Sequence, residues 1–514
     1  MPVSLHKSAV VQMCIGAFVL MCICANVRAE EPGASVVTAR LSLSVMALGE
    51  SQAQDASQNT LAFGELRGVV DGRSLAGGLE FRGDFRLRLS NDFSTADALT
   101  GVAQTTARGW LGGREYDLRE LWVGRHGESV DFALGRLIVR EADALIIDGA
   151  RAWWRVTPAW HASLFGGLYP NPYARSLPDD YIASDTLAFA AGADAAYHLP
   201  SLWGSASLVG AVFGGNHDGA PISPASPLGK PATEASRVYV TWTNAWRATA
   251  WLDLFHDLVV DLAGSAGAQL TRADLDASLH WRRLEGDAGW DHLSSLAIDM
   301  YLVNLLTDRA RSSLLPGTIE SNLVVERTAR DEGHLRVAVR PIGGLRVWGE
   351  ARLRQRALVD GAADPSYTSQ SPRGAWDLSL GARLPPERAL ADLRAAVALA
   401  YIADYRADTT LVTFDLGRDF WDERLSLDAQ LEWERIHDGG AGASMTAIAM
   451  CAQTPLAPSC YGTAAGDVLQ VGLTLALRPA PRWFALVDYR LVADSLASAR
   501  ITTQIIYARI EVRM

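Results

Sequence analysis

Apolar and polar residues alternate with a period of two in many parts of the chain. In 79–89, one face carries Leu, Phe and Gly, whereas the other carries Glu, Asp and three Arg. The ranges 345–356 and 425–434 alternate in the same way. A helix would scatter these charges around its circumference, whereas a strand places all of them on one side. The pattern therefore predicts amphipathic β-strands.

A soluble sheet also alternates, so the residue types on the two faces decide between a soluble sandwich and a membrane barrel. Many apolar faces carry Ala, Gly and Leu rather than the large side chains that fill the core between packed sheets. The polar faces are dense in opposite charges, which are costly in a dry core but natural beside a water-filled lumen. We therefore predict an all-β fold, a transmembrane antiparallel up-and-down β-barrel.

The connections between the predicted strands fall into two kinds. Short Pro-containing turns lie at 157–160, 199–203 and 478–483, and in each a Trp opens the next strand, where an interfacial aromatic girdle would lie. The longer connections are polar and rich in Gly, Pro, Ser and Asp. These predicted long loops are 91–114, 170–184, 215–235, 357–373 and 438–465. Short turns on one rim and long loops on the other are typical of an outer-membrane barrel.

The number of strands is less well defined than their type. Because 236–256 fits either one long strand or a hairpin, we expect about 22 strands, within a range of roughly 18 to 24. No plug-sized domain precedes the first strand, which argues against a TonB-dependent transporter. The other predicted strands are 160–169, 185–198, 203–214, 274–284, 293–305, 374–384, 391–403, 466–478 and 482–492.

The N-terminus has the features of a signal peptide. Lys7 is followed by an apolar run over 9–25, and Val27-Arg28-Ala29 places small residues at a cleavage site. The apolar run is short for a membrane-spanning helix, so a retained anchor is the less favoured alternative. We expect residues 1–29 to be removed and residues 30–514 to form a barrel in the outer membrane.

Charge and cysteine content narrow the expected partners. The formal net charge of -11 argues against nucleic acid. We expect contact with outer-membrane lipid, lipopolysaccharide and the barrel-assembly machinery. Cys451 and Cys460 lie outside the signal peptide, and an oxidising compartment with a small intervening loop suggests a disulfide between them. The ten His show no metal-ligand spacing, so neither a metal nor a cofactor is expected.

Catalytic signatures are weak in this sequence. Ala263-Gly264-Ser265-Ala266-Gly267 lacks the leading Gly of a nucleophile elbow. His256-Asp257 precedes Asp261, and we interpret this pair as the polar tip of a turn. We therefore expect no enzymatic activity.

Two segments resemble known outer-membrane proteins. Residues 506–514 have apolar side chains at every second position, which resembles the C-terminal strand that the barrel-assembly machinery recognises, although Met514 replaces the usual aromatic residue. The second segment is Tyr116-Asp117-Leu118-Arg119-Glu120-Leu121-Trp122-Val123, then Leu134-Gly135-Arg136, then Asp148-Gly149-Ala150-Arg151. It resembles alginate-export-type porins, although Leu137 stands where that family has Gln and Trp122 where it has Tyr. The resemblance implies a porin-like barrel and hints at polysaccharide export.

Rows of Arg on the polar faces carry the functional hypothesis. Rows of Arg facing acidic groups across a pore create a transverse field and bind anionic solutes weakly. The alternative is that these Arg only pair with Glu80, Asp84 and Glu350 to solvate the wall. The candidate pore-lining residues are Arg82, Arg86, Arg88, Arg151, Arg155, Arg346, Glu350, Arg352, Arg354 and Arg356.

The leading interpretation is a channel for passive diffusion of small hydrophilic solutes, with anionic ones favoured. A second interpretation is export of an anionic polysaccharide, which would require periplasmic export proteins as partners. A third is a structural or adhesive barrel with a closed lumen. All three predict the same fold.

Overall fold

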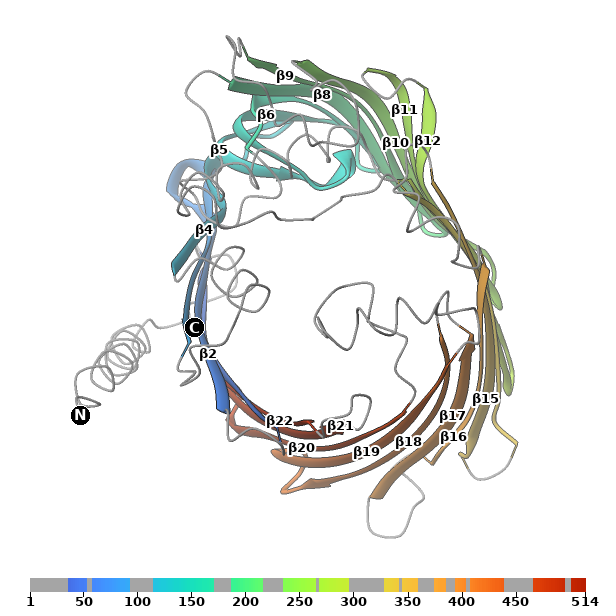
Figure 1. Ribbon diagram of the computed structural model, residues 1–514. Helices are drawn as coiled ribbons and strands as arrows, with labels where there is room; N and C mark the ends of the chain where they lie inside the picture. Colours follow the sequence, from blue (N-terminus) through green and yellow to red (C-terminus); the bar gives the residue numbers. More distant parts are fainter. Residues whose placement is uncertain are drawn as a thin grey trace, which may run out of the picture.

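The computed structural model describes residues 36–52, 58–92, 114–170, 186–215, 234–264, 268–294, 328–341, 344–358, 374–384, 393–403, 407–438, 466–494 and 501–514. These residues form one 22-stranded sheet, which appears as a ring in Figure 1. They also contain the short 3-10 turns η1 (Ala76–Gly78) and η3 (Arg140–Ala142). No helix among them is long and apolar enough to span a membrane.

The strands lie where apolar and polar residues alternate, because a strand turns successive side chains to opposite faces. The strands are β1 Val36–Gln52, β2 Gln58–Leu75, β3 Leu79–Asp92, β4 Arg114–Arg125, β5 Val130–Val139, β6 Leu145–Thr157, β7 Trp160–Leu168, β8 Thr186–His198, β9 Leu202–Gly215, β10 Glu234–Thr249, β11 Leu252–Gly264, β12 Gln269–Trp281, β13 Leu284–Ser294, β14 Thr328–Val339, β15 Arg346–Leu358, β16 Gly374–Leu384, β17 Leu393–Ala403, β18 Ala407–Phe420, β19 Leu425–Asp438, β20 Gly466–Ala480, β21 Trp483–Asp494 and β22 Ile501–Arg513.

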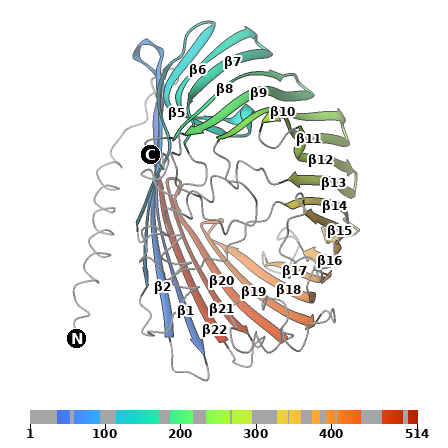
Figure 2. The same ribbon diagram turned by 45° about the horizontal axis from the view of Figure 1, so that its top comes forward.

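The sheet closes on itself. Each strand pairs antiparallel with the next along the chain, and β22 pairs with β1 from Arg40 opposite Arg513 to Gln52 opposite Ile501. Figure 2 shows β1, β2 and β22 side by side in the wall. Closure gives every strand two neighbours and removes the exposed sheet edges. The prediction of an all-β, antiparallel up-and-down barrel is confirmed, and the strand number agrees with the expected one.

The uncertain range 236–256 is a hairpin. β10 ends at Thr249 and β11 begins at Leu252, with Trp251 in the turn. His256 and Asp257 therefore lie within β11, and the predicted polar turn at this pair is wrong. Alternation places the two side chains on opposite faces of the sheet, so they cannot act together.

Two other predicted strands need correction. The range 274–284 is not one strand, because β12 ends at Trp281 and β13 begins at Leu284. The turn between them contains Arg282, which has a φ of 54° without being the Gly or Asn that usually marks such a turn. The range 293–305 overlaps β13 only as far as Ser294. Its remainder lies outside the described residues.

Turn length differs between the two rims. At the rim where β1 begins and β22 ends, the three predicted short turns join Thr157 to Trp160, His198 to Leu202, and Ala480 to Trp483. At the opposite rim, strand ends bracket all five predicted long loops, whose interiors lie outside the described residues. The segment between Ser294 and Thr328, also at this rim, was not among the predicted loops.

The β5–β6 hairpin identifies the inner face of the sheet. Figure 1 shows the end of this hairpin inside the ring, and it contacts the side chains of Tyr239, Thr241 and Arg272. These side chains therefore point inward, and the strand register extends the assignment around the barrel. In the predicted strands 79–89, 345–356 and 425–434, the charged side is the inner side. The outer side carries large apolar residues that are at least half exposed, such as Leu353 at 69% and Leu380 at 57%.

Tryptophans mark the outer face near the short turns. Trp160, Trp246 and Trp281 are 46%, 47% and 56% exposed there. Trp483 also lies on the outer face, opposite Val512. Trp203 differs from the prediction, because β9 begins one residue earlier, at Leu202, and alternation turns Trp203 to the inner face.

Candidate functional site: a hairpin folded into a charged barrel

The β5–β6 hairpin leaves the barrel wall. β4 pairs with β5 only over Leu121 to Arg125, whereas β5 and β6 stay paired with each other as far as Val139 opposite Leu145. β6 in turn pairs with β7 only from Asp148 onward. Residues 137–147, here called the tip, are therefore not paired with a wall strand, and they lie inside the ring in Figure 1.

A row of glycines lies where the hairpin bends. Gly135, Gly149 and Gly167 are opposite one another on β5, β6 and β7. Gly135 has a φ of +129°, and a Cβ there would lie 2.2 Å from the carbonyl oxygen of Leu121. A Cβ on Gly149 would lie 2.1 Å from the carbonyl oxygen of Gly166. Glycine is therefore required for this backbone conformation and this close approach of strands.

An apolar cluster holds the tip against the wall. The tip is apolar on the side that faces the wall, and small side chains of β8 and β9 leave room for it there. Removing both surfaces from water stabilises the folded hairpin by about 25 cal/mol per Å² of apolar area. The cluster comprises Leu137, Val139, Ala142, Leu145 and Ile147 of the tip, Ala133 of β5, and Phe165, Ala188, Ala190, Val209, Ala211, Tyr239 and Val259 of the wall.

Two hydroxyl groups of β10 hold the backbone of the tip. Tyr239 donates its Oη–H to the carbonyl oxygen of Ala142 at 3.3 Å. Thr241 donates its Oγ1–H to the carbonyl oxygen of Glu141 at 2.5 Å. Tyr239 and Thr241 are 3% and 2% exposed, so both contacts are shielded from water.

An ion pair joins the tip to a more distant part of the wall. Arg272 of β12 donates to Asp143 at 2.6 Å and to Asp257 of β11 at 2.5 Å. Asp143 and Ala144 have φ values of 62° and 54°, which form the tight reversal that presents the Asp143 carboxylate to Arg272. The tip is thus fixed to β10 and β12 as well as to its own strands.

Arg151 is buried beneath the tip. Its side chain is 5% exposed, and that of its partner Asp194 is 0% exposed. Arg151 donates to Asp194 at 2.9 Å, to Glu141 of the tip at 2.8 Å and to Ser163 at 2.9 Å. Arg151 was predicted to line the pore. The tip covers it instead, so it meets no open lumen.

The segment that resembles alginate-export-type porins supplies the bend itself. Arg136 donates from Nε and Nη2 to the two carboxylate oxygens of Asp148, each at 2.6 Å. It also donates from Nη1 to the carbonyl oxygen of Leu118 at 2.9 Å, where β4 no longer pairs with β5. Gly135 and Gly149 from the same motif allow the bend. In this chain the motif therefore has a structural role.

The other nominated arginines of the N-terminal half face inward in ion pairs. The expected partner Asp84 binds Arg67, at 2.7 Å, and Arg82, Arg86 and Arg88 have other carboxylates. The pairs are Arg82–Glu120 at 2.5 Å, Arg82–Asp71 at 3.4 Å, Arg86–Asp117 at 2.9 Å, Arg88–Glu65 at 2.9 Å, Arg88–Glu115 at 3.0 Å and Arg155–Asp131 at 3.2 Å.

The nominated residues of β15 also lie on the inner face. Arg352 is 48% exposed and pairs with Glu350 at 2.5 Å, and Arg354 pairs with Asp377. Arg346 pairs with Glu285 at 2.6 Å. The side chain of Arg356 lies outside the described residues. In the described part of the chain, every candidate pore-lining Arg side chain is therefore paired with a carboxylate. This is the arrangement expected from the alternative to a free Arg ladder.

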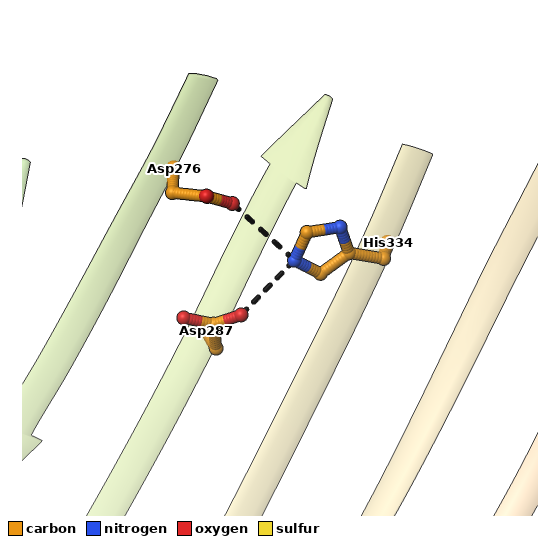
Figure 3. Close-up of side chains that lie close together, drawn as sticks. All are labelled: Asp276, Asp287 and His334. Atoms are coloured by element: carbon orange, nitrogen blue, oxygen red, sulfur yellow. Dashed lines mark hydrogen bonds and ion pairs between the residues drawn. The ribbon is translucent and has the colours of Figure 1, made fainter. Parts of the chain in front are cut away.

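A group that could hold a metal lies on the neighbouring strands. Asp276, Asp287 and His334 come from β12, β13 and β14, and their ligand atoms lie within 4.8 Å of one another (Figure 3). Spacing in the sequence did not reveal this group, because its members are separated by a turn and by the segment between β13 and β14. Strand register alone brings them together.

Two predictions concern residues that the structure does not describe. The signal peptide at 1–29 and the disulfide between Cys451 and Cys460 both lie outside the described residues. Both stay predictions.

A closed antiparallel barrel with an apolar outer face and a charged inner face has the architecture of a transmembrane β-barrel. No family model matches the sequence, and no curated protein matches it, so the resemblance to alginate-export-type porins gains no support.

Among solved structures, the chain is similar to the translocation pore of the P pilus usher PapC, with 9% identity, a TM-score of 0.43 and coverage of 92% of this chain and 99% of that one. It is also similar to Pseudomonas aeruginosa OpdL, with 10% identity, a TM-score of 0.38 and coverage of 93% and 99%. Pseudomonas aeruginosa OpdK with vanillate gives 10% identity, a TM-score of 0.39 and coverage of 93% and 99%. These distant likenesses carry no function to this chain.

Proposed function

We propose that this protein is an outer-membrane channel for passive diffusion of small hydrophilic solutes. The observation that carries the proposal is the inner face, where ion-paired Arg, Asp and Glu side chains follow the strands around a closed barrel. Such a density of charge is costly in a dry interior but stable beside water. The apolar outer face supplies the matching surface for lipid.

The tip sets the geometry of the proposed passage. It occupies the part of the ring in front of β8 to β10 and is fixed there by Tyr239, Thr241 and Arg272. Solutes would therefore pass between the tip and the opposite wall. In this proposal the tip is a fixed constriction, because its contacts are buried and include an apolar cluster.

Conductance across a planar bilayer tests the channel directly. Purified full-length protein, added at low concentration in 1 M KCl, should produce stepwise current increases of uniform size. Heat-denatured protein from the same preparation serves as the control. Absence of steps from a preparation that retains the circular dichroism of a β-barrel would overturn the proposal and leave a structural or adhesive barrel.

Selectivity is proposed to favour anions through the arginines of β15. Arg352 and Arg354 lie two residues apart on the inner face, and the 48% exposure of Arg352 leaves it able to meet a solute while paired with Glu350. A positive row opposite acidic groups elsewhere on the wall creates a transverse field, which attracts anions more strongly at low salt.

Replacing both residues, in Arg352→Ala/Arg354→Ala, is expected to lower the anion-to-cation permeability ratio by about twofold or more at low salt. The reversal potential in a KCl gradient measures this ratio. Arg424→Ala/Arg482→Ala removes the same charge from turns at the rim and should change the ratio much less. Equal shifts in the two double variants would show that total charge, rather than the β15 row, sets selectivity.

A further inference from the structure

We propose that Asp276, Asp287 and His334 form a binding site for a divalent transition-metal ion of the Zn²⁺ class on the inner wall. Metal binding would be a function additional to the proposed passive diffusion, because a channel for hydrophilic solutes needs no bound metal. The site lies on β12, β13 and β14, and its His334 is opposite Arg352 of β15 in the strand register. Figure 3 shows the three side chains converging over the middle strand.

Two of the three distances between the donor atoms are close to those around a metal ion, and all three atoms lie within 4.8 Å of one another. His334 Nε2 lies 3.0 Å from Asp287 Oδ1 and 3.5 Å from Asp276 Oδ1. Zn²⁺ binds imidazole nitrogen and carboxylate oxygen at about 2.0 to 2.2 Å, so adjacent ligands of a tetrahedral ion lie about 3.4 Å apart. An ion can therefore enter between these three atoms with only small side-chain adjustments.

Gly289 makes the convergence possible. In the strand register it lies on β13, between Asp276 of β12 and His334 of β14. A Cβ on Gly289 would lie 2.1 Å from Asp276 Oδ1 and 2.4 Å from His334 Cε1. The two side chains thus occupy the space that a side chain of the middle strand would fill. By contrast, a Cβ on the nearby Gly333 would meet nothing within 4 Å.

The chemistry of the donors indicates the class of ion. One imidazole nitrogen with two carboxylate oxygens suits Zn²⁺, Mn²⁺ and Fe²⁺, whereas Ca²⁺ and Mg²⁺ prefer oxygen alone. Three protein ligands leave a coordination position for water. Ser278 donates to Asp287 Oδ2 at 2.7 Å, which orients that carboxylate as an outer-shell partner does.

The charges around the site are predominantly negative. Asp274, two residues from Asp276, is opposite Asp291 in the register, and Asp291 Oδ2 lies 4.0 Å from His334 Nδ1. The nearby cations are Arg336, opposite Asp287, and Arg352, opposite His334. The guanidinium of Arg336 lies 5.3 Å from the ring centroid of Trp348, and Arg352 pairs with Glu350. The excess of carboxylates favours a dication. Without a metal, His334 Nε2 lies within hydrogen-bonding distance of Asp287 Oδ1, and binding measurements distinguish this hydrogen bond from a bound ion.

Titration of the purified, untagged full-length barrel in detergent with Co²⁺ gives the primary test, because bound Co²⁺ develops visible absorption. Zn²⁺ should displace it at one equivalent per chain. His334→Ala and Asp276→Asn are each expected to weaken Co²⁺ binding by at least about tenfold, more than the loss of an outer-shell partner at the low end of its range. Glu285→Gln removes one charge from the same inner face of β13 without removing a ligand, because Glu285 pairs with Arg340 and Arg346. It should weaken binding less than about threefold.

A pair of glycine variants tests the geometry separately. Gly289→Ala should weaken Co²⁺ binding as strongly as the loss of a ligand, whereas Gly333→Ala should leave it unchanged. Circular dichroism confirms that each variant is folded. Absence of stoichiometric Co²⁺ binding to the folded wild type would overturn the site. Equal losses in Glu285→Gln and Asp276→Asn would reduce it to diffuse attraction by acidic residues. Because binding is measured without any current, a failure here is distinct from failure of the channel.

Discussion

Replacing the hairpin tip with a short turn is expected to raise single-channel conductance roughly twofold or more, because the open cross-section of a water-filled pore limits its current. The variant substitutes Asn-Gly for residues 138–146, a two-residue turn that suits a β-hairpin. Leu137 and Ile147 are directly opposite each other and can carry that turn. Conductance in planar bilayers, compared with wild type at the same salt concentration, measures the effect.

A second variant tests the same constriction without shortening the chain. Thr241→Val/Arg272→Ala removes two of the contacts that hold the tip, and it should produce larger or fluctuating current steps. Thr474→Val/Arg490→Ala is the matched control, because these two side chains donate to Asp488 rather than to the tip. If the shortened variant and the double variant both conduct like wild type, the tip does not constrict the passage.

Loss of Arg151 is expected to be the most destabilising single change among the ion-paired arginines. Arg151→Met leaves Asp194, whose side chain is 0% exposed, without its cationic partner. An uncompensated buried charge of this kind lowers the free energy of unfolding by about 3–5 kcal/mol. Denaturant titration of the barrel folded in lipid vesicles measures the change.

Two further variants distinguish the effect of a buried, uncompensated charge on the free energy of unfolding from the effect of losing an exposed ion pair. Arg155→Met breaks a pair with Asp131 in which the Arg side chain is 35% exposed, and it should cost about 1 kcal/mol or less. Arg151→Met/Asp194→Leu removes both buried charges and should recover most of the stability lost in the single variant. A loss in Arg151→Met no larger than that in Arg155→Met would contradict the buried network.

Most of the fold could be predicted from the sequence, because a strand facing lipid on one side and charge on the other leaves a period-two pattern. The segments at 79–89 and 425–434 coincide with β3 and β19 for this reason. The boundary between β12 and β13 was missed, since the alternation runs through a turn at Arg282 that lacks the usual turn residues. The prediction of strand boundaries was therefore limited by turns that lack typical turn residues.

The candidate site was less visible in the sequence. Alternation assigned Arg82 and Arg352 to the inner face. Their ion-pair partners could not be predicted, because most of them lie on neighbouring strands and the period of two does not determine the register between strands. The sequence contains one sign of the inward hairpin, namely Gly135 and Gly149 of the motif. Only the strand pairing shows that these glycines mark a bend. His334 could not be linked to Asp276, because that contact depends on Gly289 between them.

The central claim is that the charged inner face borders water that crosses a membrane. Cysteine substitution with recording of single-channel current tests it most directly. Ser379 lies opposite Glu350 on the inner face, and Leu353 is 69% exposed on the outer face. We predict that an anionic, membrane-impermeant methanethiosulfonate reagent will lower the current in steps through Ser379→Cys, but not through Leu353→Cys or wild type. Absence of current through wild type, or block of Leu353→Cys alone, would contradict the account.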